Sequence, residues 1–361
     1  MEPIRFVHTS DWCLAAPYEF APGSVADKLR KLQRKAIEAL ADGWGQGEES
    51  PDLLFITGNL FSEPTPSLDT LEWLRSLFRR LREMDVQVCV LRGPTDPRDP
   101  SWAEGAGVHL FQEETRTTVG PCTIHALPPQ ASRRGENLLR HLAGREEADI
   151  LLFVGHLIDD ENEQADCHPF RKEDLAALPY KYAALGGRRC AQVFVDLEGT
   201  FAAYAGSPFA TSFSKDDLGS RFFVEGRLEE GTVFLERRRL GVPEFGAVRM
   251  DCTGKAPEEL LSRIGKRCRS ASRSASILHV SLEGTPSLRT LSFRDTLGKA
   301  LEGVVWLDLD TQFNGIDLGE EEDALVRRFV ERIGEERGLD EATRQVALEL
   351  GVKALVSPKD G

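Results

Sequence analysis

The segment IRFVHTSDWCL, residues 4–14, decides the fold, because a short apolar run passes directly into a polar turn. Ile4 to His8 has the pattern of a buried strand. The same arrangement returns downstream, where apolar runs end in glycine-containing or polar loops at 57–61, 91–96, 153–156 and 184–190. Such loops predict the carboxyl edge of a layered α/β core, where open sheets place their sites.

Amphipathic stretches separate these strands. A helix is predicted from about Ser24 to Ala41, and a second begins after Ser67 as N-cap with an apolar stripe as far as Leu81. From Gln192 to Leu240 the pattern changes to short strands and turns. The first half is therefore typical of an α/β core with added antiparallel strands.

The composition shifts after Leu240, and a smaller α/β unit is predicted there. Its strands are expected at 247–251, 276–282 and 304–309, with helices at 257–268 and around 293–301. An acidic helical segment follows from Gly319, with a last helix from Glu341 to Leu350. We therefore expect three parts, residues 1–242, 243–318 and 319–361.

Composition limits the classes of function. The 361 residues are 41% hydrophobic and 29% charged, with a mean hydropathy of −0.31, which is typical of a globular protein with a sizeable core. The formal net charge of −14 means that nucleic acid or anionic lipid could bind only through a local basic patch. Seven scattered cysteines, no signal peptide and no membrane span predict a cytoplasmic protein with reduced thiols.

The five loops resemble, in order and context, the calcineurin-like metallophosphoesterases, and in particular the SbcD family of double-strand-break nucleases. FVHTSDWCL is similar to HTSDWHL, DLLFITGNLF to DLVLIAGDLF, and YAALGGRRCAQ to YIALGHIHxAQ. The resemblance covers roughly residues 3–240. It implies a layered β-sandwich core flanked by helices, a small α/β capping domain and C-terminal helices.

In this family two divalent cations grip the phosphate and generate the attacking hydroxide. Asp11 and His156 match ligand positions of the family pattern. Asn59 stands where the bridging aspartate belongs, and Thr95 replaces the catalytic histidine. The other substituted ligand positions are Cys13, Pro94, Gly187 and Arg189.

Arg189 is the most consequential change, because a guanidinium stays protonated and opposes a dication at the same place. We therefore expect no cofactor and no catalysis, with Arg189 or Arg188 forming an internal ion pair with Asp11. An alternative is a residual phosphodiesterase that holds manganese or zinc at partial occupancy on Asp11, Cys13 and His156.

Structural explanations stand beside these hypotheses. Asp11 could cap the turn after the first strand, and His156 could be a satisfied histidine left after metal loss. His8 is expected to be a hydrogen-bonded core histidine, and Cys13 a small buried side chain. Asp96 is expected to have a structural or supporting role.

The resemblance implies an SbcC-type ATPase and DNA ends as partners, while a homodimer is left open and no membrane contact is expected. The C-terminal helices are the candidate partner surface, through Leu325, Phe329 and Ile333, although packing on their own domain is the default. A basic patch could meet DNA phosphates, or be a solvated helix face; its residues are Arg263, Lys266, Arg267 and Arg269. We expect a degenerate SbcD-like pseudonuclease, or else a binding module without nuclease or ATPase partner.

Overall fold

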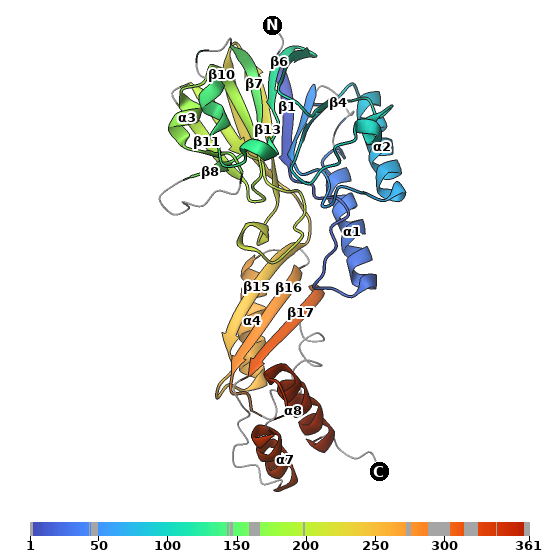
Figure 1. Ribbon diagram of the computed structural model, residues 1–361, viewed down its shortest axis with the longest axis vertical. Coiled ribbons are helices and arrows are strands. Elements are labelled where there is room, and N and C mark those ends of the chain that lie inside the picture. Colours follow the sequence, from blue (N-terminus) through green and yellow to red (C-terminus); the bar gives the residue numbers. More distant parts are fainter. Residues whose placement is uncertain are drawn as a thin grey trace. The chain divides into compact units, whose positions relative to one another are not determined.

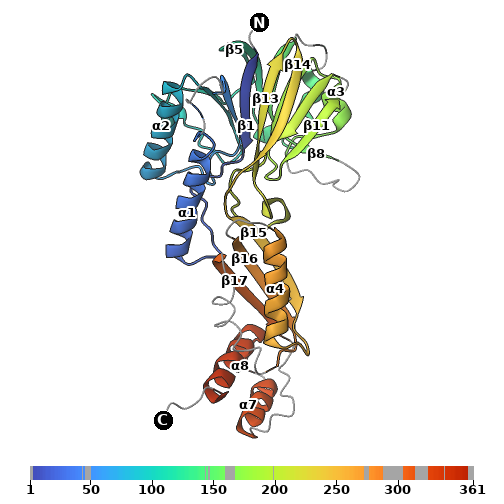
Figure 2. The same cartoon turned by 180° about the vertical axis from the view of Figure 1, so that it is seen from behind.

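The computed structural model describes residues 3–42, 44, 50–142, 144, 147–158, 167–197, 199–271, 276–287, 304–313, 324–336 and 338–356. Internal contacts divide the chain into two compact units, Met1–Val242 and Pro243–Gly361. The first unit combines parallel strands and helices with antiparallel additions, and the second combines a parallel sheet with helices, as Figures 1 and 2 show.

The first unit contains two six-stranded mixed sheets. In the first sheet the strand order is β14-β13-β1-β2-β3-β4. The four strands β1 to β4 run parallel, and the β13–β14 hairpin joins antiparallel to β1. Their bounds are β1 (Ile4–Ser10), β2 (Leu53–Gly58), β3 (Gln87–Arg92), β4 (Val108–Phe111), β13 (Phe222–Glu229) and β14 (Thr232–Arg239).

The second sheet has the order β11-β12-β10-β7-β6-β5. Its four inner strands are parallel, and both edge strands are antiparallel to their neighbours. The bounds are β5 (Thr115–Val119), β6 (Cys122–Leu127), β7 (Ala148–Val154), β10 (Tyr180–Gly186), β11 (Gln192–Leu197) and β12 (Thr200–Tyr204). A two-stranded ribbon pairs β8 (His156–Leu157) with β9 (Pro169–Phe170).

The main hydrophobic core lies between these two sheets. Phe6 and Phe55 from the first sheet pack with Ile150 and Tyr182 from the second, and all four side chains are almost completely buried. The rings of Phe6 and Tyr182 lie 4.8 Å apart between centroids. Alternation along each strand places these residues on the inner face, so the two sheets are held together by apolar burial.

Helices cover the outer faces of the sheets (Figures 1 and 2). On the first sheet these are α1 (Gly23–Glu38) and α2 (Leu68–Glu83), and on the second α3 (Lys172–Ala176). Ser67 is the N-cap of α2, as its sequence predicts, and its hydroxyl accepts a hydrogen bond from the Thr70 amide at 3.3 Å. Short 3₁₀ turns occupy Pro100–Ala103, Ala131–Arg133, Leu138–Leu142 and Lys215–Asp217.

The second unit has a parallel sheet of three strands, β15 (Glu244–Asp251), β16 (Ser276–Gly284) and β17 (Val304–Phe313). Helix α4 (Pro257–Ala271) packs on one face through Leu260 and Ile264. Helices α7 (Ala324–Glu335) and α8 (Glu341–Val356) pack on each other around Val326 and Val352. The predicted helix around 293–301 lies outside the described residues.

The mixed α/β class with several mixed sheets agrees with the expectation from the sequence. The strands β4, β5 and β6 were not predicted. Segments such as Thr115–Val119, with the sequence TRTTV, are mostly polar and lack the apolar run that marks a buried strand. Among the described helices, none is both long and apolar enough to cross a membrane.

Candidate functional site

Five loops meet at the carboxyl edge of the two sheets of the first unit. They follow β1, β2, β3, β7 and β10, which are parallel within their sheets. Hydrogen bonds connect these loops, from Asn59 and Gly187 to Asp11, from Thr95 to Asn59, and between His156 and Gly187. The structure therefore brings together the loop residues that the sequence singled out.

Asp11 is the centre of this edge and joins the two sheets. Its Oδ1 accepts the Asn59 backbone N–H at 3.1 Å, and its Oδ2 accepts the Gly187 backbone N–H at 2.9 Å. Only 2% of Asp11 is exposed, and its φ of 45° is left-handed. Both partners lie on other loops, so Asp11 is a bridge between loops rather than the cap of its own turn.

Gly58 makes room for this carboxylate. Its φ is +88°, and a Cβ at this position would lie 2.5 Å from Asp11 Oδ1. Any larger residue would push the carboxylate away from the Asn59 amide. Burial raises the pKa of Asp11 above its ordinary value, while the two backbone N–H groups and the nearby Arg189 guanidinium oppose that rise.

The substituted residues on the next two loops, Asn59 and Thr95, also form hydrogen bonds within the protein. The side-chain oxygen of Asn59 accepts the Thr95 backbone N–H at 3.0 Å, and the Thr95 hydroxyl donates to the Phe61 carbonyl at 2.7 Å. Pro94, which precedes Thr95 in the chain, offers no donor or ligand atom on its side chain. Asn59 and Thr95 therefore tie the loop after β2 to the loop after β3.

Asp96 holds the same two loops. Its Oδ1 accepts the Phe61 N–H and its Oδ2 accepts the Gly93 N–H, both at 2.8 Å. The side chain is almost completely buried, and burial raises its pKa to about 7 against these backbone hydrogen bonds. This arrangement agrees with the structural role expected for Asp96.

His156 also bonds within the protein. Its Nε2 lies 3.0 Å from the Gly187 carbonyl oxygen, and because a carbonyl only accepts, that nitrogen carries the proton. In this tautomer Nε2 has no lone pair for a metal, whereas Nδ1 keeps one. Gly187 has φ +97°, so this turn suits glycine, and its N–H and C=O serve Asp11 and His156 respectively.

Arg189 does not pair with Asp11, and this expectation was wrong. Its Nη1 donates to Asp217 Oδ2 at 2.7 Å and to Thr211 Oγ1 at 2.6 Å. The Asp217 side chain is fully buried, and a second guanidinium, that of Arg221, lies 3.8 Å from its Oδ1. A buried carboxylate needs a cation, whereas the two oxygens of Asp11 already accept backbone N–H groups.

Arg188, the alternative partner of Asp11, also lies elsewhere. Its Nη1 donates to Gln192 Oε1 at 3.1 Å, and its guanidinium lies 5.8 Å from the centroid of the Tyr204 ring. Cys13 is buried, and burial raises the pKa of its thiol to about 12. The thiol is therefore protonated near neutral pH in the metal-free protein.

These residues do not fit a binuclear metal centre. Such a centre needs several carboxylates and imidazoles directed at two cations, with one carboxylate bridging them. In the parts of the chain that the structure describes, no three His, Cys, Asp or Glu side chains are grouped to hold an ion. Asn59 offers a neutral amide, Pro94 has no ligand atom on its side chain and Arg189 carries a positive charge, so these three positions do not supply ligands for two cations.

The sequence predicted the role of one further residue near this edge, His8, but not that of another, Asp217. His8 is a core histidine, as expected, because its ring nitrogens bond the Tyr182 hydroxyl at 2.8 Å and the Thr57 hydroxyl at 2.9 Å. Asp217 was missed, although it holds the charge of Arg189. Its signal was the acidic pair Asp216 and Asp217 in the segment SKDDLGSR, residues 214–221.

The predicted DNA-binding residues lie on α4 of the second unit. Arg263 pairs with Glu259 one turn earlier at 2.7 Å, with both side chains about half exposed, and Lys266 is exposed. The side chains of Arg267 and Arg269 lie outside the described part of the chain. DNA contact through this patch stays a prediction.

The predicted partner residues lie on α7 and differ in exposure. Leu325 is 60% exposed. Phe329 packs on α8, since a Cβ at Gly351 would lie 2.0 Å from its ring, and Ile333 is half-buried. Phe329 therefore contributes to its own domain, the default expectation, while a partner at Leu325 stays a prediction.

Comparison with known proteins gives one distant relative. The chain is 25% identical over 198 residues to YhaO of Bacillus subtilis strain 168, an uncharacterized metallophosphoesterase, and the match covers 51% of this chain. This chain is a distant homologue of a metallophosphoesterase. The match covers 48% of YhaO, so the chain spans about half the length of that relative.

The other comparisons add little. No family model matches the chain. A solved structure of glutamine-dependent NAD+ synthetase from Acinetobacter baumannii, in complex with ADP, aligns over 99% of this chain and 73% of that protein, with 11% identity and a TM-score of 0.37. A likeness at that level carries no conclusion. Membership of the SbcD family stays a prediction.

Proposed function

We propose that this chain is a catalytically inactive SbcD-like protein, a pseudonuclease that acts as a scaffold or DNA-end-associated subunit. The observation that carries the proposal is the use of Asp11 as an internal bridge. Both of its oxygens accept backbone N–H groups, from Asn59 and Gly187. A carboxylate held in this way stabilises the fold without needing a metal ion.

The chemistry of the neighbouring positions supports the same proposal. Metal-assisted phosphodiester hydrolysis needs an activated water and a group that protonates the leaving oxygen. Thr95 stands at the position of that acid, and its hydroxyl donates to a backbone carbonyl instead. Arg189 keeps a permanent positive charge at a former imidazole position and is fixed there by Asp217.

Hydrolysis by the purified full chain tests the loss of catalysis. Linear duplex DNA and bis-p-nitrophenyl phosphate are incubated with manganese or zinc, and Asp11→Asn is compared with Asp69→Asn, whose carboxylate is exposed. We expect rates equal to the protein-free reaction for all three proteins. Activity that Asp11→Asn abolishes and Asp69→Asn retains would instead support the residual phosphodiesterase on Asp11, Cys13 and His156.

The scaffold role is tested separately, by association with an SbcC-type ATPase. The exposed Leu325 is changed to Glu, with Leu68→Glu as a matched control, because Leu68 is 77% exposed on the first unit. We expect co-purification that only Leu325→Glu abolishes. Failure of the wild-type chain to associate would contradict the scaffold role and favour a stand-alone binding module.

A further inference from the structure

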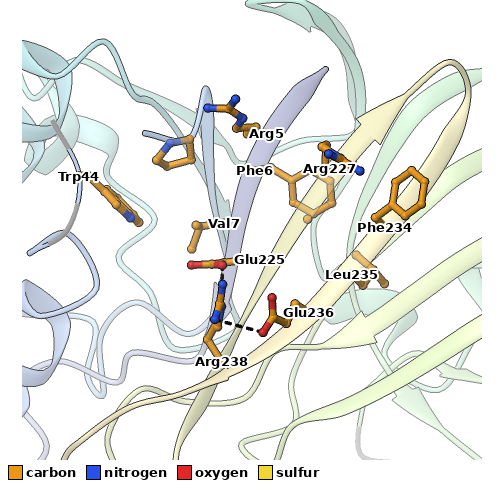
Figure 3. A pocket seen from close by; sticks show the side chains of 12 residues that line it. Arg5, Phe6, Val7, Trp44, Glu225, Arg227, Phe234, Leu235, Glu236 and Arg238 are labelled. Carbon is orange, nitrogen blue, oxygen red and sulfur yellow. Dashed lines mark hydrogen bonds and ion pairs between the residues drawn. The ribbon is translucent and has the colours of Figure 1, made fainter. Parts of the chain in front are cut away.

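A cavity of about 620 Å³ lies on the outer face of the first sheet, away from the loops at its carboxyl edge (Figure 3). Strands β1, β13 and β14 form its floor, and Trp44 and Pro51 line it from outside these strands. This volume lies in the range of small-molecule sites. The side chains that give it chemical character are Arg5, Trp44, Glu225, Arg227, Phe234 and Arg238.

Strand register places two arginines next to each other on this face. Arg5 on β1 is paired with Arg227 on β13, and Arg227 is paired in turn with Phe234 on β14. Like charges directly opposite each other on neighbouring strands are destabilising. An anion bound at these two arginines would reduce this repulsion, in a protein whose net charge is −14.

The guanidinium groups of Arg5 and Arg227 differ in their contacts with neighbouring side chains. Arg227 lies 4.7 Å from the centroid of the Phe234 ring and 3.3 Å from a carboxylate oxygen of Glu229, with both charged side chains almost half exposed. No ion pair joins Arg5 to another residue in the part of the chain described by the structure. Arg5 therefore brings a positive charge to the cavity, and Arg227 is held in place by the ring of Phe234.

Carboxylates next to the two arginines on the same face of the sheet limit the size of the anion. Glu225 and Glu236 are paired across β13 and β14, and Arg238 bonds both, at 2.8 Å and 3.1 Å. Figure 3 shows this network below the two arginines. A polyanion that continued from Arg5 and Arg227 in this direction would meet these carboxylates, so a single phosphate fits better than a strand of nucleic acid.

Trp44 supplies an aromatic surface on the side of the cavity opposite Phe234 in Figure 3. Indole rings stack on planar bases, and guanidinium groups bind phosphate in a two-pronged geometry. We propose that this cavity binds a nucleoside monophosphate, with its phosphate held by Arg5 and Arg227 and its base against Trp44. This site is independent of the function proposed for the loop edge.

Calorimetric titration of the full chain with AMP tests the site, with adenosine and inorganic phosphate as separate probes. We expect AMP to bind, and to bind more tightly than either probe. Arg5→Gln and Arg227→Gln should each weaken AMP binding about tenfold or more, because each removes a charge-assisted contact. Trp44→Ala should weaken AMP binding and leave phosphate binding unchanged.

Arg237→Gln is the matched control. It removes one arginine charge from β14, the strand paired with β13, but Arg237 lies over the Phe222 ring at 4.3 Å and does not line the cavity. Its AMP affinity should equal that of the wild type. The proposal is overturned if millimolar AMP gives no binding, or if Arg237→Gln weakens binding as much as Arg5→Gln. It is also overturned if single-stranded DNA binds the same residues more tightly than AMP.

Discussion

Replacing Asp11 should make the first unit easier to unfold, whether or not a metal ion is present. Asp11→Ala leaves the N–H groups of Asn59 and Gly187 without their acceptor. Each such loss costs about 1–3 kcal/mol, so the free energy of unfolding should fall by about 2–6 kcal/mol. Relief of the buried charge favours the lower half of that range, because burial already raises the pKa of Asp11.

Asp11→Asn separates the hydrogen bonds from the shape of the side chain. Asparagine tolerates the left-handed φ of 45° and keeps one accepting oxygen, so it should lose about 1–3 kcal/mol, the cost of one unpaired donor. Urea unfolding followed by tryptophan fluorescence measures both variants, once with EDTA and once with manganese. The losses should be the same in the two buffers.

The control is Asp69→Ala, which removes an 81% exposed carboxylate that pairs with Arg34. Exposed pairs of this kind contribute about 0–1 kcal/mol. The reasoning is refuted if Asp11→Ala destabilises no more than Asp69→Ala does. It is also refuted if the loss appears only with manganese, since a metal-ligand role would then explain the residue.

Three further changes test other parts of the structure. Burial lowers the pKa of His8 to about 3 from 6.5, so between these pH values the unfolded chain binds a proton that the folded chain does not. The free energy of unfolding should therefore fall by up to about 1.4 kcal/mol per pH unit as the pH drops from 6.5 towards 3. Urea titrations at several pH values should show a weaker dependence of stability on pH in His8→Gln, and an unchanged dependence would contradict this. Gly58→Ala, with a Cβ 2.5 Å from Asp11, should destabilise more than Gly105→Ala, where φ is also positive but no atom lies within 4 Å; equal melting temperatures would show that the contact does not matter. Arg189→Met should cost about 3 kcal/mol in chemical denaturation, because it removes a cation from the buried Asp217, and a neutral result would show that Arg221 alone suffices.

The sequence predicted most of the framework around the candidate site. Parallel strands separated by helices bring their loops to one edge, so the sequence predicted that the loops of Asp11, Asn59 and His156 lie at such an edge. The N-cap of α2 and the buried His8 were also predictable, because each depends on local pattern. The strands β5 and β6 were not, since their pairing is decided by contacts distant in sequence.

The partner of Arg189 could not be predicted from the family motifs. The positive charge was identified correctly, but two carboxylates were available to it, and the choice depends on where backbone N–H groups point. Asn59 and Gly187 already serve Asp11, whereas Asp217 is buried beside Arg189 and Arg221. Backbone direction in loops is set by tertiary packing, and a linear motif does not contain it.

The central claim is that the loop edge is stabilised by internal hydrogen bonds and ion pairs in place of paired metal ions. Equilibrium dialysis of the full chain against manganese, followed by elemental analysis, measures this directly. The account predicts far less than one manganese per chain, with no difference between wild type and Asp11→Asn. Two manganese ions per wild-type chain, both lost in Asp11→Asn, would contradict it.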